Sequence, residues 1–345
     1  MSSSLRPSFT EAQQRFMTLL DRGTLPVMAA PMFLVSGPEL VIASAKAGIL
    51  GAFPAPNARN VEMLDDWLRQ TTQGIEAGAP GAPWALNMIV HSTYDRFDRE
   101  MELVKAYRPP VVSTALGSPK RVLDAVHGYG GIVMADVASP SMARKAAEAG
   151  ADVLILVANG AGGHTGQFNP FALVSEVRSF WQGPLGLAGA ITSGRDIRVA
   201  QLLGADFAVA GTRFIATQES LAQDPYRALV VRAGLEDLVL SKAVSGVAAN
   251  WFRETLEAAG IDPRSAAASE GRIDFSGDIS AGKKAWKDVW SAGHGVGGIR
   301  QVGTVASVVD ELHRGYFEVL QEEARTLPAL IARHTPSSVQ HAARP

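Results

Sequence analysis

The sequence predicts a parallel α/β fold that closes as a TIM (β/α)₈ barrel, with a smaller, mainly helical domain inserted near the C-terminus. Three observations favour this class. A chain of 345 residues is long enough for a barrel of roughly 250 residues plus an insertion. Short apolar runs alternate with amphipathic stretches, as in successive βαβ units. No GxGxxG motif follows the first apolar run, which disfavours an open dinucleotide-binding sheet.

Eight short apolar runs are the expected barrel strands. Most of them are apolar at nearly every position, as is typical of strands that are covered on both faces. The expected strands are Leu25–Ala30, Ile49–Phe53, Trp84–Ile89, Val111–Ala115, Ile132–Asp136, Val153–Ala158, Pro184–Ala188 and Phe207–Ala210.

Amphipathic stretches between these strands are the expected helices. Several begin with Ser or Asn followed by Pro, a capping residue and a favourable first helical residue, and several end in glycine. The expected helices are Pro38–Ala47, Val61–Gln73, Pro119–Val126, Pro140–Ala149, Pro170–Phe180 and Gly194–Leu203.

The pattern divides the chain into four segments. Residues 1–219 are the expected barrel, and residues 220–290, with the Ala/Ser/Gly-rich stretch Asp262–Gly282, are a mainly helical domain on the substrate side. Residues 291–330 return to the barrel and include an amphipathic helix over Val302–Thr326, and residues 331–345 are a tail.

The composition excludes several kinds of site. Apolar residues make up 47% of the chain, and the net charge of −2 comes from dispersed charges. Clustered basic residues for a nucleic acid or a membrane surface are therefore not expected. The absence of cysteine rules out disulfides, thiolate metal sites and a cysteine nucleophile, and the seven histidines have no paired metal spacing. Without a secretion signal or a membrane-spanning run, a cytoplasmic location is expected.

The loop after the sixth strand carries the strongest candidate for chemistry. It places His164 among four glycines, whose missing side chains allow a planar ligand to approach the backbone closely. A histidine at this end of a barrel strand is suited to act as a general base near neutral pH. From the residues alone, a loop histidine that only makes local hydrogen bonds is an equally good interpretation.

Two glycine turns follow the last two strands. The seventh strand leads into Gly189-Ala190, and the eighth leads into Gly211-Thr212. Backbone N–H groups of two such neighbouring turns form a phosphate site in many barrels. Ordinary tight turns are the alternative interpretation for either turn alone.

Three other strand ends carry polar or turn-forming residues. Ala30, Pro31 and Met32 follow the first strand, Asn87 lies in the third, and Asp136 ends the fifth. The amide of Asn87 is suited to hydrogen-bond a heteroaromatic ring. Local turns are again the alternative interpretation.

Together these motifs resemble the nitronate monooxygenase family, formerly called 2-nitropropane dioxygenases. The resemblance runs from about Leu25 to Leu312. Its elements are Ala30-Pro31-Met32, Ala47-Gly48-Ile49-Leu50-Gly51, Leu86-Asn87, Ala161-Gly162-Gly163-His164-Thr165-Gly166, Ala188-Gly189-Ala190-Ile191, Gly194-Arg195, Leu203-Gly204-Ala205-Asp206, Gly211-Thr212-Arg213-Phe214 and Trp290-Ser291-Ala292-Gly293-His294-Gly295.

The resemblance implies non-covalently bound FMN and a role for each motif. His164 would act as the catalytic base, and the flavin would take electrons from an alkyl nitronate before O₂ reacts, giving a carbonyl compound and nitrite. The phosphate would lie at Gly189, Ala190, Gly211 and Thr212. The other implied cofactor contacts are Ala30, Pro31, Met32, Asn87, Asp136, Gly163, Ser291, Gly293 and His294.

Three features depart from the family's pattern. Ala190 stands where relatives often carry a second glycine, and His294 stands where we expect glutamine. The segment His91–Glu100 is longer and more charged than usual.

Other functions on the same scaffold remain open. The main alternative is an FMN-dependent reductase that uses NAD(P)H and acts on an enoyl thioester or a quinone. A flavin-free isomerase or aldolase and a non-catalytic ligand-binding barrel are further alternatives. The expected partners are a small-molecule substrate and O₂, with NAD(P)H for the reductase, and a homodimer is left open.

Overall fold

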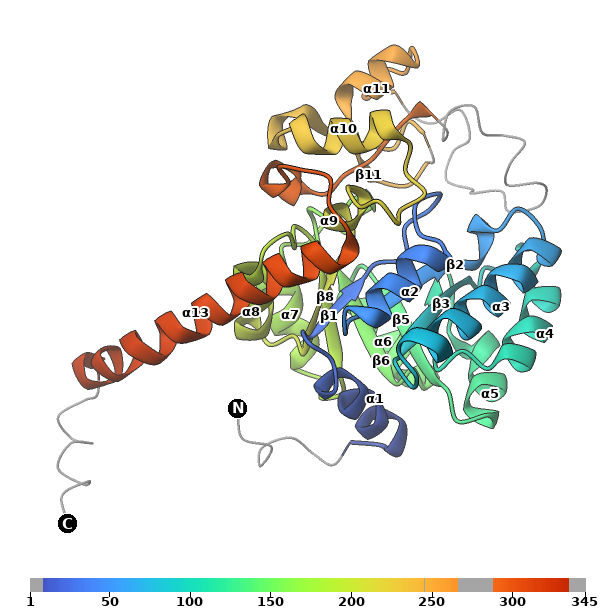
Figure 1. Ribbon diagram of the computed structural model, residues 1–345, viewed down its shortest axis with the longest axis horizontal. Helices are drawn as coiled ribbons and strands as arrows, with labels where there is room; N and C mark the ends of the chain where they lie inside the picture. The colour runs from blue at the N-terminus through green and yellow to red at the C-terminus, as the bar shows by residue number, and fades with distance from the viewer. Residues whose placement is uncertain (1–8, 245, 266–287, 335–345) are drawn as a thin grey trace.

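Eight parallel strands form a closed barrel in the computed structural model, which describes residues 9–244, 246–265 and 288–334 (Figure 1). The predicted barrel is therefore confirmed, and every predicted strand is present within about two residues of its expected bounds. The barrel strands are β1 (Val27–Ala29), β2 (Leu50–Pro54), β3 (Trp84–Ile89), β4 (Val111–Ala115), β5 (Ile132–Val137), β6 (Val153–Val157), β8 (Leu185–Ala188) and β9 (Phe207–Ala210).

The lower end of the barrel is filled by large apolar side chains. Helix α1 lies across this end, and its Phe16 packs edge-on against Phe207 of β9, with ring centroids 5.3 Å apart. Gly186 on the neighbouring strand β8 makes room for the Phe207 ring, because a Cβ there would lie 2.5 Å from it. Because this end is filled by side chains, a ligand can bind only at the opposite end of the barrel, where the strands finish.

Helices surround the barrel and follow the expected capping chemistry. Ser139 accepts a hydrogen bond from the N–H of Met142, and Gly150 ends the same helix with φ +104°, a conformation that favours glycine. The helices of the barrel are α1 (Glu11–Asp21), α2 (Pro38–Lys46), α3 (Val61–Gly78), α4 (Phe97–Tyr107), α5 (Lys120–Gly128), α6 (Pro140–Ala149), α7 (Pro170–Arg178), α8 (Gly194–Leu203) and α9 (Thr212–Ile215), with the 3₁₀ turn η2 (Ala55–Asn57).

A small antiparallel sheet lies above the barrel and was missed in the sequence. Its strands are β10 (Leu238–Ser241), β11 (Ala249–Phe252) and the two-residue strand β7 (Gly163–His164), which we expected to be loop. The described part of residues 220–290 also contains α10 (Asp224–Arg232), η3 (Leu235–Asp237) and α11 (Arg253–Ala258). This segment is thus a layer of helices and a sheet. The third strand of that sheet, β7, comes from the barrel loop after β6. Most of the stretch Asp262–Gly282 lies outside the described residues.

The C-terminal segment returns to the barrel through the 3₁₀ helix η4 (His294–Gly298) and then forms the long helix α13 (Val305–His334). Helix α13 packs along α8, where the two backbones approach so closely that a Cβ on Gly194 would lie 2.0 Å from the N of Tyr316. The helix continues eight residues beyond the expected end at Thr326, and so takes up the first residues of the expected tail. Residues 335–345 lie outside the described part.

Within the described residues, no helix has the length and apolar character that a membrane span requires.

Candidate functional site

Two turns at the C-terminal rim of the barrel present unused backbone donors. Gly189 has φ +134° and Ala190 has φ +57°, which explains why glycine is favoured at the position of Ala190. In the part of the chain that the structure describes, no acceptor is found for the N–H groups of Gly189, Ala190 and Gly211. A side chain on Gly211 would point at Ala30 and Met32, 3.5 Å from each. The turns therefore leave backbone donors for an anion.

The first turn of α8 is organised by its own side chains. The carboxylate of Asp196 accepts hydrogen bonds from the N–H groups of Thr192 (3.0 Å) and Ser193 (2.8 Å), and Ser193 accepts one from Asp196. These two N–H groups are already satisfied. An anion at this rim would therefore use the donors of Gly189, Ala190 and Gly211.

The late segment Ser291–His294 docks directly on the second turn. The N–H of Gly293 donates to Oγ1 of Thr212 (2.7 Å), and the N–H of His294 donates to the carbonyl of Gly160 (2.9 Å). A Cβ on Gly293 would lie 2.6 Å from that same carbonyl, so only glycine fits without displacement of the backbone. His294 itself is exposed, and its ring covers Gly160.

The loop that carries His164 is held from above by β11. Gly163 and His164 pair with Asn250 and Ala249, and the side chain of Asn250 donates a buried hydrogen bond to the carbonyl of Ala161 (2.7 Å). His164 is partly buried, and loss of solvation lowers the pKa of its imidazole from the ordinary value. At neutral pH this histidine is uncharged, which is the form that can accept a proton.

A row of polar side chains crosses three neighbouring strands inside the barrel. Nδ2 of Asn87 on β3 donates to Oγ of Ser113 on β4 (2.9 Å) and to Oδ2 of Asp136 on β5 (3.3 Å). Burial raises the pKa of Asp136 to about 7. Its Oδ1 is buried and, among the described residues, has no hydrogen-bond partner. A buried oxygen without a partner is expected to face a ligand or water.

The loop after β1 is fixed by two residues that the sequence analysis missed. Ser36 accepts a hydrogen bond from the N–H of Met32 and donates to the carbonyl of Ala30. Asn57, at the end of η2, accepts from the N–H of Leu34 (2.9 Å) and donates to the carbonyls of Met32 (2.9 Å) and Ser36 (2.8 Å). No local motif marks Asn57, because its partners lie more than twenty residues away.

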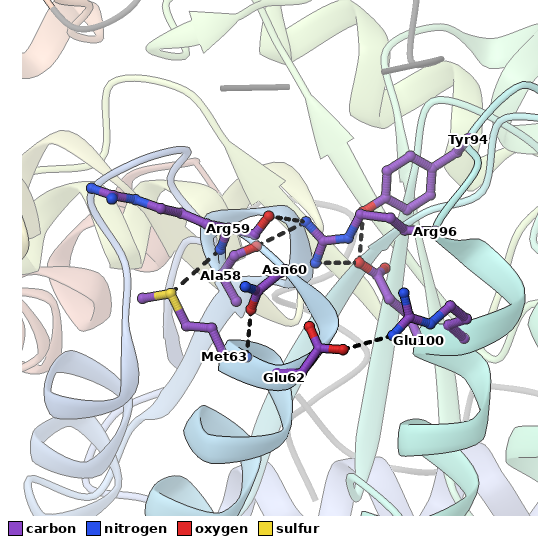
Figure 2. A network of polar contacts seen from close by, with 9 residues as sticks. Ala58, Arg59, Asn60, Glu62, Met63, Tyr94, Arg96 and Glu100 are labelled. Atoms are coloured by element: carbon purple, nitrogen blue, oxygen red, sulfur yellow. Dashed lines mark hydrogen bonds and ion pairs between the residues drawn. The ribbon is translucent and has the colours of Figure 1, made fainter. Parts of the chain in front are cut away.

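A buried ion pair supports η2 from the other side (Figure 2). Arg96 donates from Nη1 to the carbonyl of Ala58 (2.8 Å), and its Nη2 lies 2.7 Å from Oε1 of Glu100. Tyr94 donates to the same carboxylate oxygen (2.7 Å). Burial raises the pKa of Glu100 to about 7. The charged segment His91–Glu100, which departs from the family's pattern, thus supports η2 and, through η2, the loop that contains Met32.

The predicted site residues lie in three places on or near one rim. Thr212, Gly293 and His294 meet at the second turn, and Gly163 faces Ser291 across the small sheet. Asn87 and Asp136 form the polar row, while Ala30, Pro31 and Met32 lie beside Gly211. No cluster of three or more residues that could hold a metal occurs among the described residues.

The site fits a bound flavin nucleotide. The free N–H groups of the two turns suit a phosphate, and Oδ1 of Asp136 lacks a partner that a ring nitrogen could supply. Tyr226 stabilises the late segment Ser291–His294, because its hydroxyl donates a hydrogen bond to the carbonyl of Ser291 (2.5 Å).

Comparison with curated proteins finds two relatives named "(3aS,4S,5R,7aS)-5-hydroxy-7a-methyl-1-oxo-octahydro-1H-indene-4-carboxyl-CoA dehydrogenase". The protein from Mycobacterium tuberculosis is 30% identical over 67% of this chain, and that from Rhodococcus jostii is 28% identical over 64%. The chain spans only 64% and 61% of their respective lengths. A nitronate monooxygenase from Paraburkholderia phytofirmans is 28% identical over 70% of this chain and 76% of its own length.

Among solved structures, nitroalkane oxidase from Streptomyces ansochromogenes has the same fold. It superposes with a TM-score of 0.75 and 23% identity over 88% of this chain and 99% of that chain. The model of the nitronate monooxygenase family matches residues 15–315. Because this match covers most of the sequence, the chain belongs to the nitronate monooxygenase family, whose members are in general flavin-dependent.

Proposed function

We propose that this protein binds FMN at the C-terminal rim and oxidises alkyl nitronates with O₂ to a carbonyl compound and nitrite. Family membership supports the oxidoreductase chemistry. The observation that carries the proposal is the pairing, at one rim, of free backbone donors on two turns with a partly buried, neutral imidazole. FMN, when bound, supplies the two-electron acceptor that the protein itself lacks.

The protein's own residues would bind and orient the cofactor. The N–H groups of Gly189, Ala190 and Gly211 and the turn at Thr212 would hold the phosphate. The loop at Met32 would form a wall for the ring because Ser36 and Asn57 fix its backbone. Binding of the cofactor would displace water from the rim, and each of these polar contacts would then be stronger than it is in water.

His164 would hold and move the substrate proton. A neutral nitroalkane must lose its α-proton before it can be oxidised, and the uncharged imidazole accepts that proton. The pairing of β7 with β11 fixes the backbone of His164, so that the residue is part of a sheet and not of a free loop.

A second candidate is an FMN-dependent oxidoreductase that acts on acyl thioesters, with NAD(P)H as the reductant in the reductase direction. The names of the M. tuberculosis and R. jostii relatives favour it, because both denote a carboxyl-CoA dehydrogenase. In the dehydrogenase direction His164 would again remove a proton next to the thioester carbonyl, and in the reductase direction its protonated ring would return that proton.

Two measurements on the flavin-loaded protein separate these functions. A small alkyl nitronate is supplied under air while nitrite and oxygen uptake are followed. Nitronate and NAD(P)H are then each mixed with the protein without oxygen, and the flavin colour is recorded. We expect nitrite release, and loss of flavin colour with nitronate but not with NAD(P)H. Rapid bleaching by NAD(P)H, without nitrite from any nitronate, would overturn the proposal in favour of the thioester or quinone reductase.

A further inference from the structure

The interior of the barrel becomes polar near the C-terminal rim on three neighbouring strands. Successive side chains of a strand point to opposite faces, so a residue two positions after an interior residue also faces the interior. Asn87, Ser113 and Asp136 each follow an interior residue by two positions and therefore face the centre of the barrel. The interior residues that precede them are Ala85 on β3, Val111 on β4 and Met134 on β5, which pack in the same apolar cluster as Phe207.

This polar row of Asn87, Ser113 and Asp136 lies across the barrel from the two glycine turns. In the closed strand order β1-β2-β3-β4-β5-β6-β8-β9, strands β3 to β5 stand opposite β8 and β9, which lead into the turns. On the side of the turns, the interior positions near the rim are apolar, with Ala188 on β8 and Val209 on β9. The mouth of the barrel is therefore apolar beside the turns and polar opposite them.

Asp136 has one oxygen that the polar row does not use. Its Oδ2 accepts the hydrogen bond from Nδ2 of Asn87 (3.3 Å), whereas Oδ1 is buried and has no partner in the part of the chain that the structure describes. Burial raises the pKa of this carboxyl to about 7. Because Oδ2 already acts as an acceptor, the proton of the neutral acid lies on Oδ1, which is then a hydrogen-bond donor.

We propose that Asp136 determines which edge of the flavin ring is bound: its Oδ1 carries a proton and donates a hydrogen bond to an acceptor atom on the pyrimidine edge. This inference rests on the proposed function, in which the phosphate lies at the two turns. A ring that extends from these turns across the mouth would meet the polar row. The pyrimidine edge has carbonyl oxygens and a ring nitrogen that accept hydrogen bonds, whereas the dimethylbenzene edge has no acceptor. The polar row therefore suits the pyrimidine edge, which satisfies the buried Oδ1.

The protonation of Asp136 gives this contact a defined dependence on pH. The ionised carboxylate has no proton to donate and places a negative charge against the same acceptor atoms. Affinity for the ring should therefore be highest well below pH 7 and fall as pH rises through the pKa of Asp136, which binding shifts upward. Its neighbours on β3, β4 and β6 are the uncharged Asn87, Ser113 and Ile155. The imidazoles of His164 and His294 also lie at this rim, and a variant at position 136 separates their contribution.

Riboflavin binding tests this donor, because riboflavin has the ring of FMN but no phosphate that titrates. Fluorescence titration of flavin-free wild type is expected to show at least about tenfold weaker binding at pH 8.5 than at pH 5.5. Asp136→Asn keeps the shape of the neutral acid. Its oxygen can accept from Asn87 while its amide nitrogen donates to the ring, so it should bind tightly at both pH values.

Two further variants serve as comparisons. Asp136→Ala removes the donor and should bind at least about fivefold more weakly than wild type at pH 5.5. Ser113→Ala removes the other hydrogen bond of Asn87 but keeps the carboxyl, and it should retain the wild-type dependence on pH. Calorimetry at pH 7.5, in two buffers of different ionisation enthalpy, should show proton uptake when wild type binds riboflavin and less uptake in Asp136→Asn.

The contrary results are distinct from one another. Tighter wild-type binding at pH 8.5, proton release on binding, or binding by Asp136→Asn as weak as that of Asp136→Ala would show that the carboxylate accepts a hydrogen bond, and would overturn the proposal. The same dependence on pH in Asp136→Asn as in wild type would assign it to an imidazole or to Glu100 and overturn the proposal as well. If neither FMN nor riboflavin binds at any pH, the proposed function itself fails, and this inference fails with it.

Discussion

At the scale of single residues, the proposed chemistry depends on the protonation of two partly buried side chains. His164 has a lowered pKa and is neutral at pH 7, whereas burial raises the pKa of Asp136 to about 7. Both shifts come mainly from lost solvation, which disfavours the charged form of each group. The sequence predicted both residues at strand ends, but it could not predict their protonation, because burial depends on the loops packed above them.

His164→Gln tests the role of the imidazole as a base. Turnover of a neutral nitroalkane should fall by about 10² to 10⁴, because proton removal loses its acceptor. Turnover of the pre-formed nitronate should fall much less, since that substrate has already lost the proton. Steady-state rates with both substrates measure the difference, and the wild-type activity with the nitroalkane should persist below pH 6.5. Equal losses with both substrates would exclude a base.

Asp136→Asn tests the buried carboxyl through stability. Because its pKa is higher in the folded state than the unfolded value near 3.8, the folded protein binds more protons between about pH 4 and 7, and stability falls as pH rises through this range. The variant lacks this proton and should lose less stability across the range, by on the order of 1–3 kcal/mol. Urea unfolding of flavin-free protein at pH 5 and pH 8 measures this.

A residual decrease of the same sign is expected in the Asp136→Asn variant, because Glu100 also has a raised pKa of about 7. An unchanged difference between pH 5 and pH 8 would show that Asp136 does not hold a proton in the folded protein.

At the scale of elements, the rim is held by contacts between segments far apart in sequence. The turn η2 supports the loop after β1, and the late segment Ser291–His294 closes on the turn after β9. The barrel strands were predictable because each is a continuous apolar run. Strand β7 was not, because it has only two residues in a glycine-rich sequence, which gives no strand signal. Strands β10 and β11 were not, because each has only four residues, too few for periodicity to identify a strand.

Asn57→Ala should loosen the wall formed by the loop at Met32. The change removes three hydrogen bonds and leaves buried backbone groups without partners, which costs roughly 1–3 kcal/mol for each unsatisfied group. We expect at least tenfold weaker binding of FMN and a similar loss for riboflavin, because under the proposed function the wall would contact the ring. Fluorescence titration measures both. Arg59→Ala is the control, since only backbone groups of Arg59 join the network, and its affinity should equal that of the wild type.

Gly293→Ala should separate the late segment from the rim. The added Cβ would lie 2.6 Å from the carbonyl of Gly160, and such overpacking costs about 1–3 kcal/mol. The unfolding midpoint and the FMN affinity should both fall. Gly297→Ala is a matched control in the same segment, because its Cβ would meet no atom closer than 3.8 Å. Wild-type behaviour of Gly293→Ala would show that this docking is not needed.

At the scale of the whole molecule, more of the barrel could be predicted from the sequence than of the helix-and-sheet layer above it. Periodicity and capping residues are local, so the eight strands and six of the helices around them could be predicted in order, whereas α1, α4 and α9 were not among the expected helices. The contacts of Asn57, Asn250 and Tyr226 join distant segments, and a single sequence contains no local signal for them. The extension of α13 past Thr326 was missed because its apolar residues face outward and its Pro328 suggests an end to the helix.

The central claim is that two neighbouring turns of the barrel form an anion site that binds the phosphate of FMN. Titration of flavin-free protein with FMN and with riboflavin, under identical conditions, tests it most directly, because the two ligands share the ring and differ in the phosphate. Hydrogen bonds to a charged group contribute about 1.5–3 kcal/mol each, so FMN should bind at least about 100-fold more tightly than riboflavin. Equal affinities for the two ligands would contradict the anion site.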